Sequence, residues 1–130
     1  MALMLFREPN QARWGGVRPA HRGTQVEKSN SVTNGTIIVH TVTAGKTLFL
    51  CTVVVEFRFG GLAAWDFLAV RNEADVFQYY IARLRDNTAG TVGLVIPYWP
   101  PREISAGYDI YLTSSGVNND MAADIFGWEE

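Results

Sequence analysis

Few residues of this 130-residue chain have the types and spacing that catalysis or metal binding requires. Its two histidines, His21 and His40, stand in separate segments, and a lone histidine in a β-branched run is most often a hydrogen-bonded structural residue. No Cys–His pair and no HExxH or GxSxG motif occurs in the chain. We therefore expect a protein that is not an enzyme and that uses no cofactor.

Oxygen ligands offer the best remaining candidate for a metal site. The stretch NNDMAAD at 118–124 gathers two asparagines and two aspartates, which are side chains that calcium prefers. It lacks the alternating carboxylate spacing of an EF-hand loop, and a polar turn between strands explains it more simply. Asp66, Asp75 and Asp109 lie in separate segments, and the sequence brings no two of them together as a glycosidase pair. We expect no metal site.

Two similar stretches, TAGKTLFLCT at 43–52 and SAGYDIYLTS at 105–114, resemble a repeated ligand loop. A phosphate-binding loop needs a helix directly after its glycines, whereas alternating apolar residues typical of strands follow both stretches. We expect Gly45 and Gly107 to supply the positive φ of tight turns where the chain enters the second sheet from the first. The strands after these turns are predicted to alternate in the same phase, with Leu48 and Leu50 matching Ile110 and Leu112 on one face and Phe49 matching Tyr111 on the other.

From residue 36 onward, β-branched and aromatic runs alternate with turn signals. The expected strands are 36–42, 47–59, 64–72, 76–86, 91–99, 108–115 and 121–129, and the run 91–99 is expected to stop at Pro100-Pro101. Residues 73–87 also fit a helical period, although their Tyr-Tyr-Ile content favours a strand. Because no long crossover helix is available, the strands should be antiparallel. We predict an all-β fold, an antiparallel jelly-roll β-sandwich of about eight strands, with an immunoglobulin-like sandwich or an up-and-down barrel as the alternatives.

Residues 1–35 differ from the rest, because they are rich in Pro, Gly, Asn and Arg and follow neither a helical nor a strand period. They carry five cations against two carboxylates, a net charge of +3, and the remaining residues carry −5. We interpret 1–35 as an extended N-terminal arm and 36–130 as the sandwich domain. Aromatic and basic residues in such an arm have no local core to join, so we predict that they contact a partner. These residues are Phe6, Arg7, Arg13, Trp14, Arg18 and Arg22.

The turn-and-strand patterns VTAGKTLFL at 42–50 and PPREISAGYDI at 100–110 also carry a family resemblance. Over residues 36–130 the chain resembles the small jelly-roll capsid decoration, or cement, proteins of tailed bacteriophages. That resemblance implies a virion structural protein, made in the host cytoplasm, that sits as a homotrimer on the outside of a phage head. Its implied partners are the major capsid protein and other copies of itself.

Other classes of function follow from composition. Four tryptophans and five tyrosines could form a flat sugar-stacking surface, which is the hypothesis of a module on a phage tail or fibre that binds host glycans. A small cupin-like enzyme is disfavoured because no histidine cluster occurs. A net charge of −2 gives no nucleic-acid footprint, and no apolar run of 18 residues indicates a membrane span. The single cysteine, Cys51, lies in the apolar run LFLCTVVV and is expected in the core.

Overall fold

All helices and strands assigned in the residues that the structure describes are β-strands. The computed structural model describes residues 23–60, 64–86, 89–116 and 118–130. The eight strands are β1 (Thr24–Thr33), β2 (Gly35–Thr41), β3 (Leu48–Gly60), β4 (Ala64–Arg71), β5 (Phe77–Asp86), β6 (Ala89–Ile104), β7 (Asp109–Ser114) and β8 (Asp120–Glu129).

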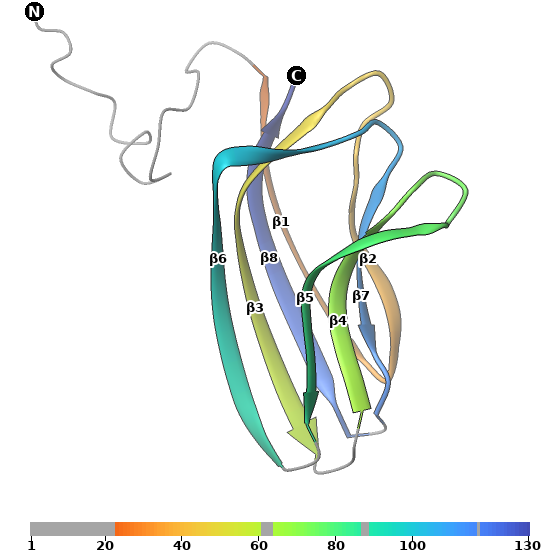
Figure 1. The fold of residues 1–130 in the computed structure, drawn as a ribbon, viewed down its shortest axis with the longest axis vertical. Helices are drawn as coiled ribbons and strands as arrows, with labels where there is room; N and C mark the ends of the chain where they lie inside the picture. Colours follow the sequence, from red (N-terminus) through yellow and green to blue (C-terminus); the bar gives the residue numbers. More distant parts are fainter. Residues whose placement is uncertain (1–22, 61–63, 87–88, 117) are drawn as a thin grey trace, which may run out of the picture.

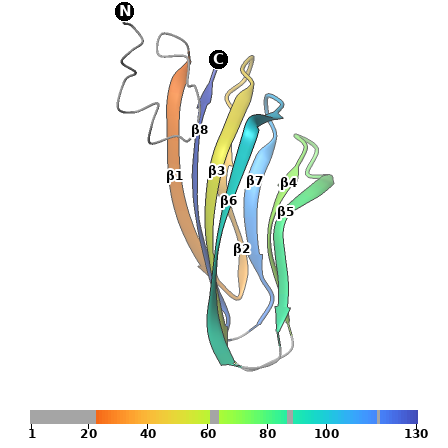
Figure 2. The ribbon, with the colours of Figure 1, turned by 60° about the vertical axis from the view of Figure 1, so that its left-hand side comes forward.

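The strands form two antiparallel four-stranded sheets that pack face to face (Figures 1 and 2). One sheet has the order β1-β8-β3-β6 and the other has the order β2-β7-β4-β5. Successive strands mostly alternate between the two sheets, and β4 with β5 forms the one hairpin within a sheet. This strand order is the double Greek key of a jelly roll. The predicted fold class is confirmed.

The core lies between the sheets and follows the alternation of the sequence. In β3, every second side chain from Val53 to Phe59 is buried, as the period of a strand requires. Cys51 causes a change of register against both neighbouring strands and is itself buried, as expected. The matched positions after the two AG turns are all fully buried: Leu48, Leu50, Ile110 and Leu112. Burial of side chains of this size contributes about 2 kcal/mol each to folding.

The two AG turns have the predicted backbone geometry. Gly45 has φ of 76° and Gly107 has φ of 79°, the region that favours glycine. Gly45 lies between β2 and β3, and Gly107 lies between β6 and β7, so each turn carries the chain from one sheet to the other. A backbone hydrogen bond closes each turn, from Lys46 N–H to Thr43 and from Tyr108 N–H to Ser105. The repeated stretch therefore belongs to the architecture.

The first strand corrects the predicted boundary of the arm. Residues 24–33 form β1, which pairs with β8 along its whole length, so the sandwich begins well before residue 36. β1 is an edge strand. Val26 and Val32 are its only apolar residues, and both contribute to the core. Because its other side chains are polar and mostly exposed, the strand has almost no hydrophobic alternation for a sequence pattern to detect.

Strand β6 corrects a second boundary, since it runs past Pro100-Pro101 to Ile104. It pairs only with β3, and an edge strand tolerates proline because its outer N–H groups need no partner. The register shifts between the pairs Thr52↔Pro97 and Leu50↔Arg102, so the proline segment lies in an irregularity of the strand. The helical alternative for residues 73–87 is wrong, because Phe77–Asp86 pairs with β4 as strand β5.

A close approach of β8 to β3 gives a prediction for stability. A Cβ added to Gly127 would overlap the carbonyl oxygen of Phe49, which belongs to backbone and cannot swing aside. We expect Gly127→Ala to lower the free energy of unfolding by about 1–3 kcal/mol, as overpacking in a well-packed site does. The matched control is Gly90→Ala, where nothing lies within 4 Å of the new Cβ. Urea denaturation of both variants tests this, and equal stability would contradict the backbone overlap.

Candidate interaction surface

Aromatic and arginine side chains gather on the outer face of the β2-β7-β4-β5 sheet. In β4, Asp66, Leu68 and Val70 are buried between the sheets, so the alternate residues point outward. The antiparallel register then places the arginines of β5 beside them, with Trp65 opposite Arg85 and Phe67 opposite Arg83. We name this set the aromatic–arginine face, and it comprises Trp65, Phe67, Arg71, Phe77, Tyr80, Arg83, Arg85 and Tyr111.

The side chains of the aromatic–arginine face are ordered by contacts with one another. The Arg83 guanidinium lies 4.4 Å from the ring centre of Trp65 and 4.5 Å from that of Tyr80. Phe67 meets Tyr80 edge-on at 5.3 Å and Tyr111 edge-on at 5.9 Å between ring centres. Cation–π and edge-on aromatic contacts are each worth about 0.5–1.5 kcal/mol. The face is therefore preorganised before any partner binds.

Much of this apolar surface remains open to solvent. Trp65, Phe77 and Tyr80 are 43%, 45% and 42% exposed. Arg83 and Arg85 are exposed, and neither forms an ion pair with a described residue. The guanidinium groups lie against aromatic rings, so their N–H edges are available to carboxylates. A surface of this kind is suited to binding an acidic protein partner.

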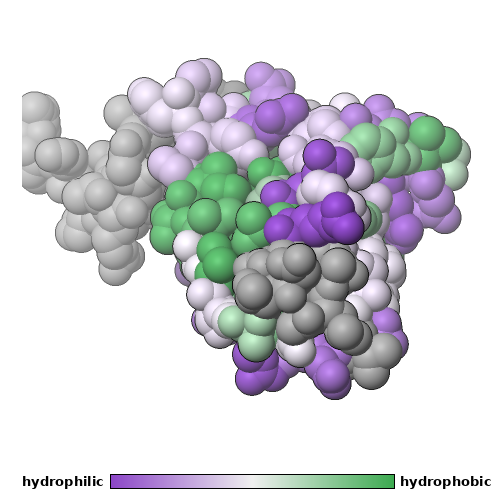
Figure 3. Space-filling view, turned by 60° about the horizontal axis from the view of Figure 1, so that its bottom comes forward, coloured by the Kyte–Doolittle hydropathy of each residue, from purple (hydrophilic) through white to green (hydrophobic). Residues whose placement is uncertain are grey.

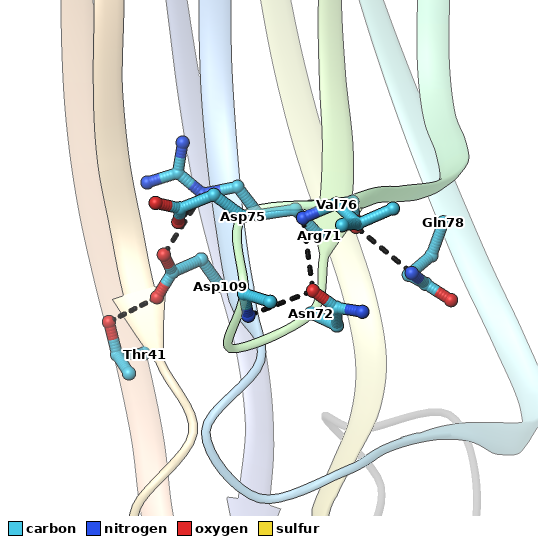
Figure 4. A network of polar contacts seen from close by, with 8 residues as sticks. Thr41, Arg71, Asn72, Asp75, Val76, Gln78 and Asp109 are labelled. Atoms are coloured by element: carbon cyan, nitrogen blue, oxygen red, sulfur yellow. Dashed lines mark hydrogen bonds and ion pairs between the residues drawn. The ribbon is translucent and has the colours of Figure 1, made fainter.

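Arg71 anchors the face to the neighbouring strands (Figure 4). Its Nε lies 3.0 Å from Asp109 Oδ2 and 3.2 Å from Asp75 Oδ1, and its guanidinium lies 4.9 Å from the ring centre of Tyr111. The Thr41 hydroxyl donates to Asp109 Oδ1 at 2.5 Å. Burial raises the pKa of Tyr111, and the nearby positive charge of Arg71 only partly offsets this rise. The network joins β2, β7 and β4 under the face.

Asn72 fixes the turn between β4 and β5, where the aromatic–arginine face ends. Its Oδ1 accepts hydrogen bonds from the N–H groups of Ala74 at 2.9 Å and Val76 at 3.0 Å (Figure 4). Asp75 adopts φ of 62° in this turn, a conformation that aspartate tolerates better than most residues. Val76, at the end of the turn, is 55% exposed. The turn extends the apolar surface beside Phe77.

A second apolar area lies on β6, the edge of the other sheet. Val95 and Trp99 are 68% and 64% exposed. Figure 3 shows hydrophobic residues gathered on the side of the molecule where β6 runs in Figure 1. Three prolines, at 97, 100 and 101, remove N–H donors from this strand and so oppose the addition of another strand.

The gap between the edge strands β5 and β6 is bridged by one arginine. The guanidinium of Arg102 lies 3.8 Å from the ring centre of Tyr79 on β5 and 5.9 Å from that of Tyr98 on β6. Burial raises the pKa of Tyr98, and the charge of Arg102 opposes this rise. This contact closes the sandwich on the side where both sheets end.

The structure gives His40 a structural partner. His40 Nε2 lies 2.7 Å from Glu129 Oε2, which also accepts a hydrogen bond from Thr43 N–H at 3.1 Å. Burial raises the pKa of Glu129, but the hydrogen bonds from Thr43 and His40 more than offset it, so the pKa lies below its ordinary value. The cluster joins the two sheets, which agrees with the interpretation of His40 as a hydrogen-bonded residue.

The NNDMAAD stretch acts as a turn and a strand start. Asn119 is fully buried and its Oδ1 accepts a hydrogen bond from Gly60 N–H at 2.8 Å. Asp120 accepts a hydrogen bond from Thr33 at 2.6 Å and pairs with Arg58. These oxygens are therefore engaged by protein donors. In the described ranges, no group of three or more His, Cys, Asp or Glu side chains could hold a metal ion.

Asp66 is the most deeply buried carboxylate among the described residues. Its Oδ1 accepts a hydrogen bond from Ser115 N–H at 3.2 Å, and no described residue bonds its Oδ2. Burial raises the pKa of Asp66, and the hydrogen bond from Ser115 offsets only part of the rise. It lies apart from Asp75 and Asp109, which belong to the Arg71 network. The structure does bring Asp75 and Asp109 together, and both carboxylates pair there with Arg71 Nε.

The predicted partner-binding residues of the arm lie outside the described residues, and the hypothesis about them stays a prediction. They are Phe6, Arg7, Arg13, Trp14, Arg18 and Arg22. The aromatic–arginine face was not predicted. The sequence indicates it through the alternation of β4. Asp66 takes an inward position of this strand, in phase with the buried Leu68 and Val70, so Trp65 and Phe67 point outward.

No protein-family model matches this chain, and no curated protein matches its sequence. In the part of the chain that the structure describes, no helix is long and apolar enough to cross a membrane.

Proposed function

We propose that this protein is a virion structural protein, a capsid decoration or cement protein that binds the outside of a phage head. The aromatic–arginine face and the N-terminal arm provide its contacts with neighbouring subunits and with the major capsid protein. Those contacts reinforce the shell mechanically, since each copy links subunits that internal pressure would separate. Many weak links on one shell add up, because bound copies share the load.

The observation that carries this proposal is the exposed aromatic–arginine face. Trp, Tyr and Arg are the residue types that dominate binding energy in protein interfaces. Here these types lie together, ordered by mutual contacts, on one flat sheet of a fold that viral capsid proteins commonly use. The resemblance of residues 36–130 to phage cement proteins gives the proposal its particular class of partner.

Binding to phage heads tests the proposal. We expect Trp65→Ala, which removes the ring beneath Arg83 and Arg85, to weaken binding to undecorated heads about 30-fold or more, the scale of an interface hot spot. The matched control is Trp99→Ala, a more exposed tryptophan on β6 that lies outside this face. Cosedimentation with heads at increasing protein concentration measures the affinity. The proposed role of the face would be overturned if both variants bound heads with the same affinity as the unaltered chain.

Removal of residues 1–22 tests the arm separately. This deletion leaves β1 intact, because the strand begins at Thr24. Occupancy of the heads should fall if Phe6, Trp14 and the arm arginines bind a neighbour. Undiminished occupancy would assign all of the contacts to the sandwich.

Glycan recognition is the second candidate function, and the exposure of Trp99 favours it. A sugar ring needs a bare aromatic face for stacking, and Arg83 already covers a face of Trp65. Trp99 is therefore the better candidate for such a contact. A glycan array combined with tryptophan fluorescence distinguishes the two functions, because a cement protein should give no sugar response.

A further inference from the structure

We propose that the aromatic–arginine face binds the acidic outer face of the β1-β8-β3-β6 sheet of a second copy of this chain. This inference rests on the proposed function, because it names the neighbour that occupies the same surface. The two outer faces of one molecule have opposite character, so a front-to-back contact between copies matches basic groups to acidic ones.

The acidic face is set by three exposed or half-exposed carboxylates on neighbouring strands. Glu27 on β1, Glu56 on β3 and Asp124 on β8 each follow or precede a buried core residue and so point outward. None of the three forms an ion pair or a side-chain hydrogen bond with a described residue. We use the name acidic face for this set of three. Arg58 is the cation nearby, and Asp120 already pairs with it.

The spacing of the two sets of charges is compatible. Glu56 of β3 lies opposite Ala122 of β8, two residues before Asp124. Glu27 of β1 lies opposite Phe126 of β8, two residues after Asp124. Strand geometry then separates neighbouring carboxylates of this diagonal row by about 8 Å at the backbone. Arg83 and Arg85 lie two residues apart on β5, about 7 Å by the same geometry. Two arginines can therefore meet two successive carboxylates.

The surface beside the acidic face also has room for a side chain. A shallow hollow of about 290 Å³ lies there, and Ser31, Thr33, Glu56 and Ala122 are among the residues that line it. The small side chains of Ser31, Thr33 and Ala122 leave this part of the surface recessed. On the opposite face Trp65 and Phe77 protrude, with more than two fifths of their surface exposed. Shape and charge thus favour the same pairing of faces.

Such a contact joins two different surfaces, so each copy keeps one of each available. A heterologous contact of this type repeats from copy to copy and closes into a ring where the rotation allows. Because the two faces lie on opposite sides of one sandwich, successive copies stack in a row, and three copies do not close into a ring. The N-terminal arm remains available for contacts with the shell.

Charge reversal tests the contact in solution. The unaltered chain should associate beyond a dimer as its concentration rises, and high salt should weaken the association. The variant Arg83→Glu with Arg85→Glu, and the variant Glu56→Lys with Asp124→Lys, should each lower the association constant about 100-fold, because like charges then meet. The chain with all four changes should recover association to within about 10-fold. Sedimentation velocity at several concentrations measures each constant.

The controls are Lys46→Glu and Glu73→Lys, each of which reverses one charge of the same sign in an exposed turn outside both faces. Thermal unfolding shows whether each variant is folded. If a reversal variant does not fold, cysteine cross-linking replaces it. A mixture of Arg85→Cys and Asp124→Cys chains should then form a disulfide between copies that neither variant forms alone.

Three results would overturn the inference. These are a chain that stays monomeric at all concentrations, association that reversal of the acidic face leaves unchanged, or no rescue in the fourfold variant. The second result would indicate a contact of the aromatic–arginine face with itself. Loss of head binding in Trp65→Ala alongside a monomeric chain would leave the proposed function standing. Salt-sensitive assembly without any binding to heads would instead overturn that function alone.

Discussion

Replacing Asp109 by alanine is expected to lower the free energy of unfolding by about 3 kcal/mol, the scale for breaking a buried ion pair. The Asp109 carboxylate is buried and bonds both Arg71 Nε and the Thr41 hydroxyl. Its loss leaves the largely buried Arg71 side chain with Asp75 alone, at 3.2 Å, and Asp75 is mostly exposed. Arg71 would then turn toward solvent and leave the ring of Tyr111. Urea denaturation monitored by tryptophan fluorescence measures the change.

The same arginine provides the matched control. Asp75→Ala removes the exposed partner of Arg71, and exposed ion pairs are worth at most about 1 kcal/mol. Asp109→Asn keeps an oxygen for one donor and should fall between the two alanine variants. Asp109→Ala should also weaken head binding, since the anchor of the aromatic–arginine face is lost. Equal destabilisation by both alanine changes would contradict the account, because of the two aspartates only Asp109 bonds side chains of both β2 and β4.

The core strands could be predicted because their burial follows a local period. In β3 the buried residues from Val53 to Phe59 alternate with less buried ones, β7 is buried almost throughout, and the glycines of the two AG turns mark the strand starts. The length and number of these strands, with no candidate helix for a crossover, favoured the jelly roll. The boundaries failed at the sheet edges. β1 lies at one edge of its sheet, so one of its sides needs no contact with the core, and most of its residues are polar. β6 lies at the other edge of the same sheet and tolerates its prolines because no strand pairs with its outer side.

The candidate site depends on contacts that no local pattern contains. Trp65 meets Arg83 and Arg85 only because β4 and β5 pair in one particular register, and two bulges shift that register along the hairpin. Tyr111 joins the same face from a strand about 40 residues along the chain. The number of aromatic residues can be read from the sequence, but which of them remain exposed cannot. Trp128, for example, is buried and stacks on Phe49, whereas Trp99 is exposed.

Glu129→Gln gives the second large expected effect, a loss of about 1.5–3 kcal/mol at neutral pH, the range for hydrogen bonds to a charged group. The buried Glu129 carboxylate bonds His40 and Thr43 N–H and so ties the end of β8 to β2 and to the loop that follows β2. Glutamine keeps the shape of the side chain but carries no charge. Urea denaturation of both chains at pH 7 measures the difference, and Glu103→Gln, an exposed residue of β6, is the control.

The sign of the pH dependence follows from the direction of the shift. The pKa of Glu129 is lower in the folded chain than its ordinary value of 4.5, because hydrogen bonds from Thr43 and His40 outweigh the effect of burial. The unfolded chain therefore binds the proton more readily, and the stabilisation is complete above pH 4.5 and is lost as the pH falls through the lowered pKa. The pKa of Asp66 is raised by burial, so its contribution changes in the opposite sense, and the difference between the unaltered chain and Glu129→Gln isolates Glu129. That difference should shrink as the pH falls below 4.5. A difference that grows as the pH falls below this value would show that the carboxylate is not held in its charged form by His40 and Thr43.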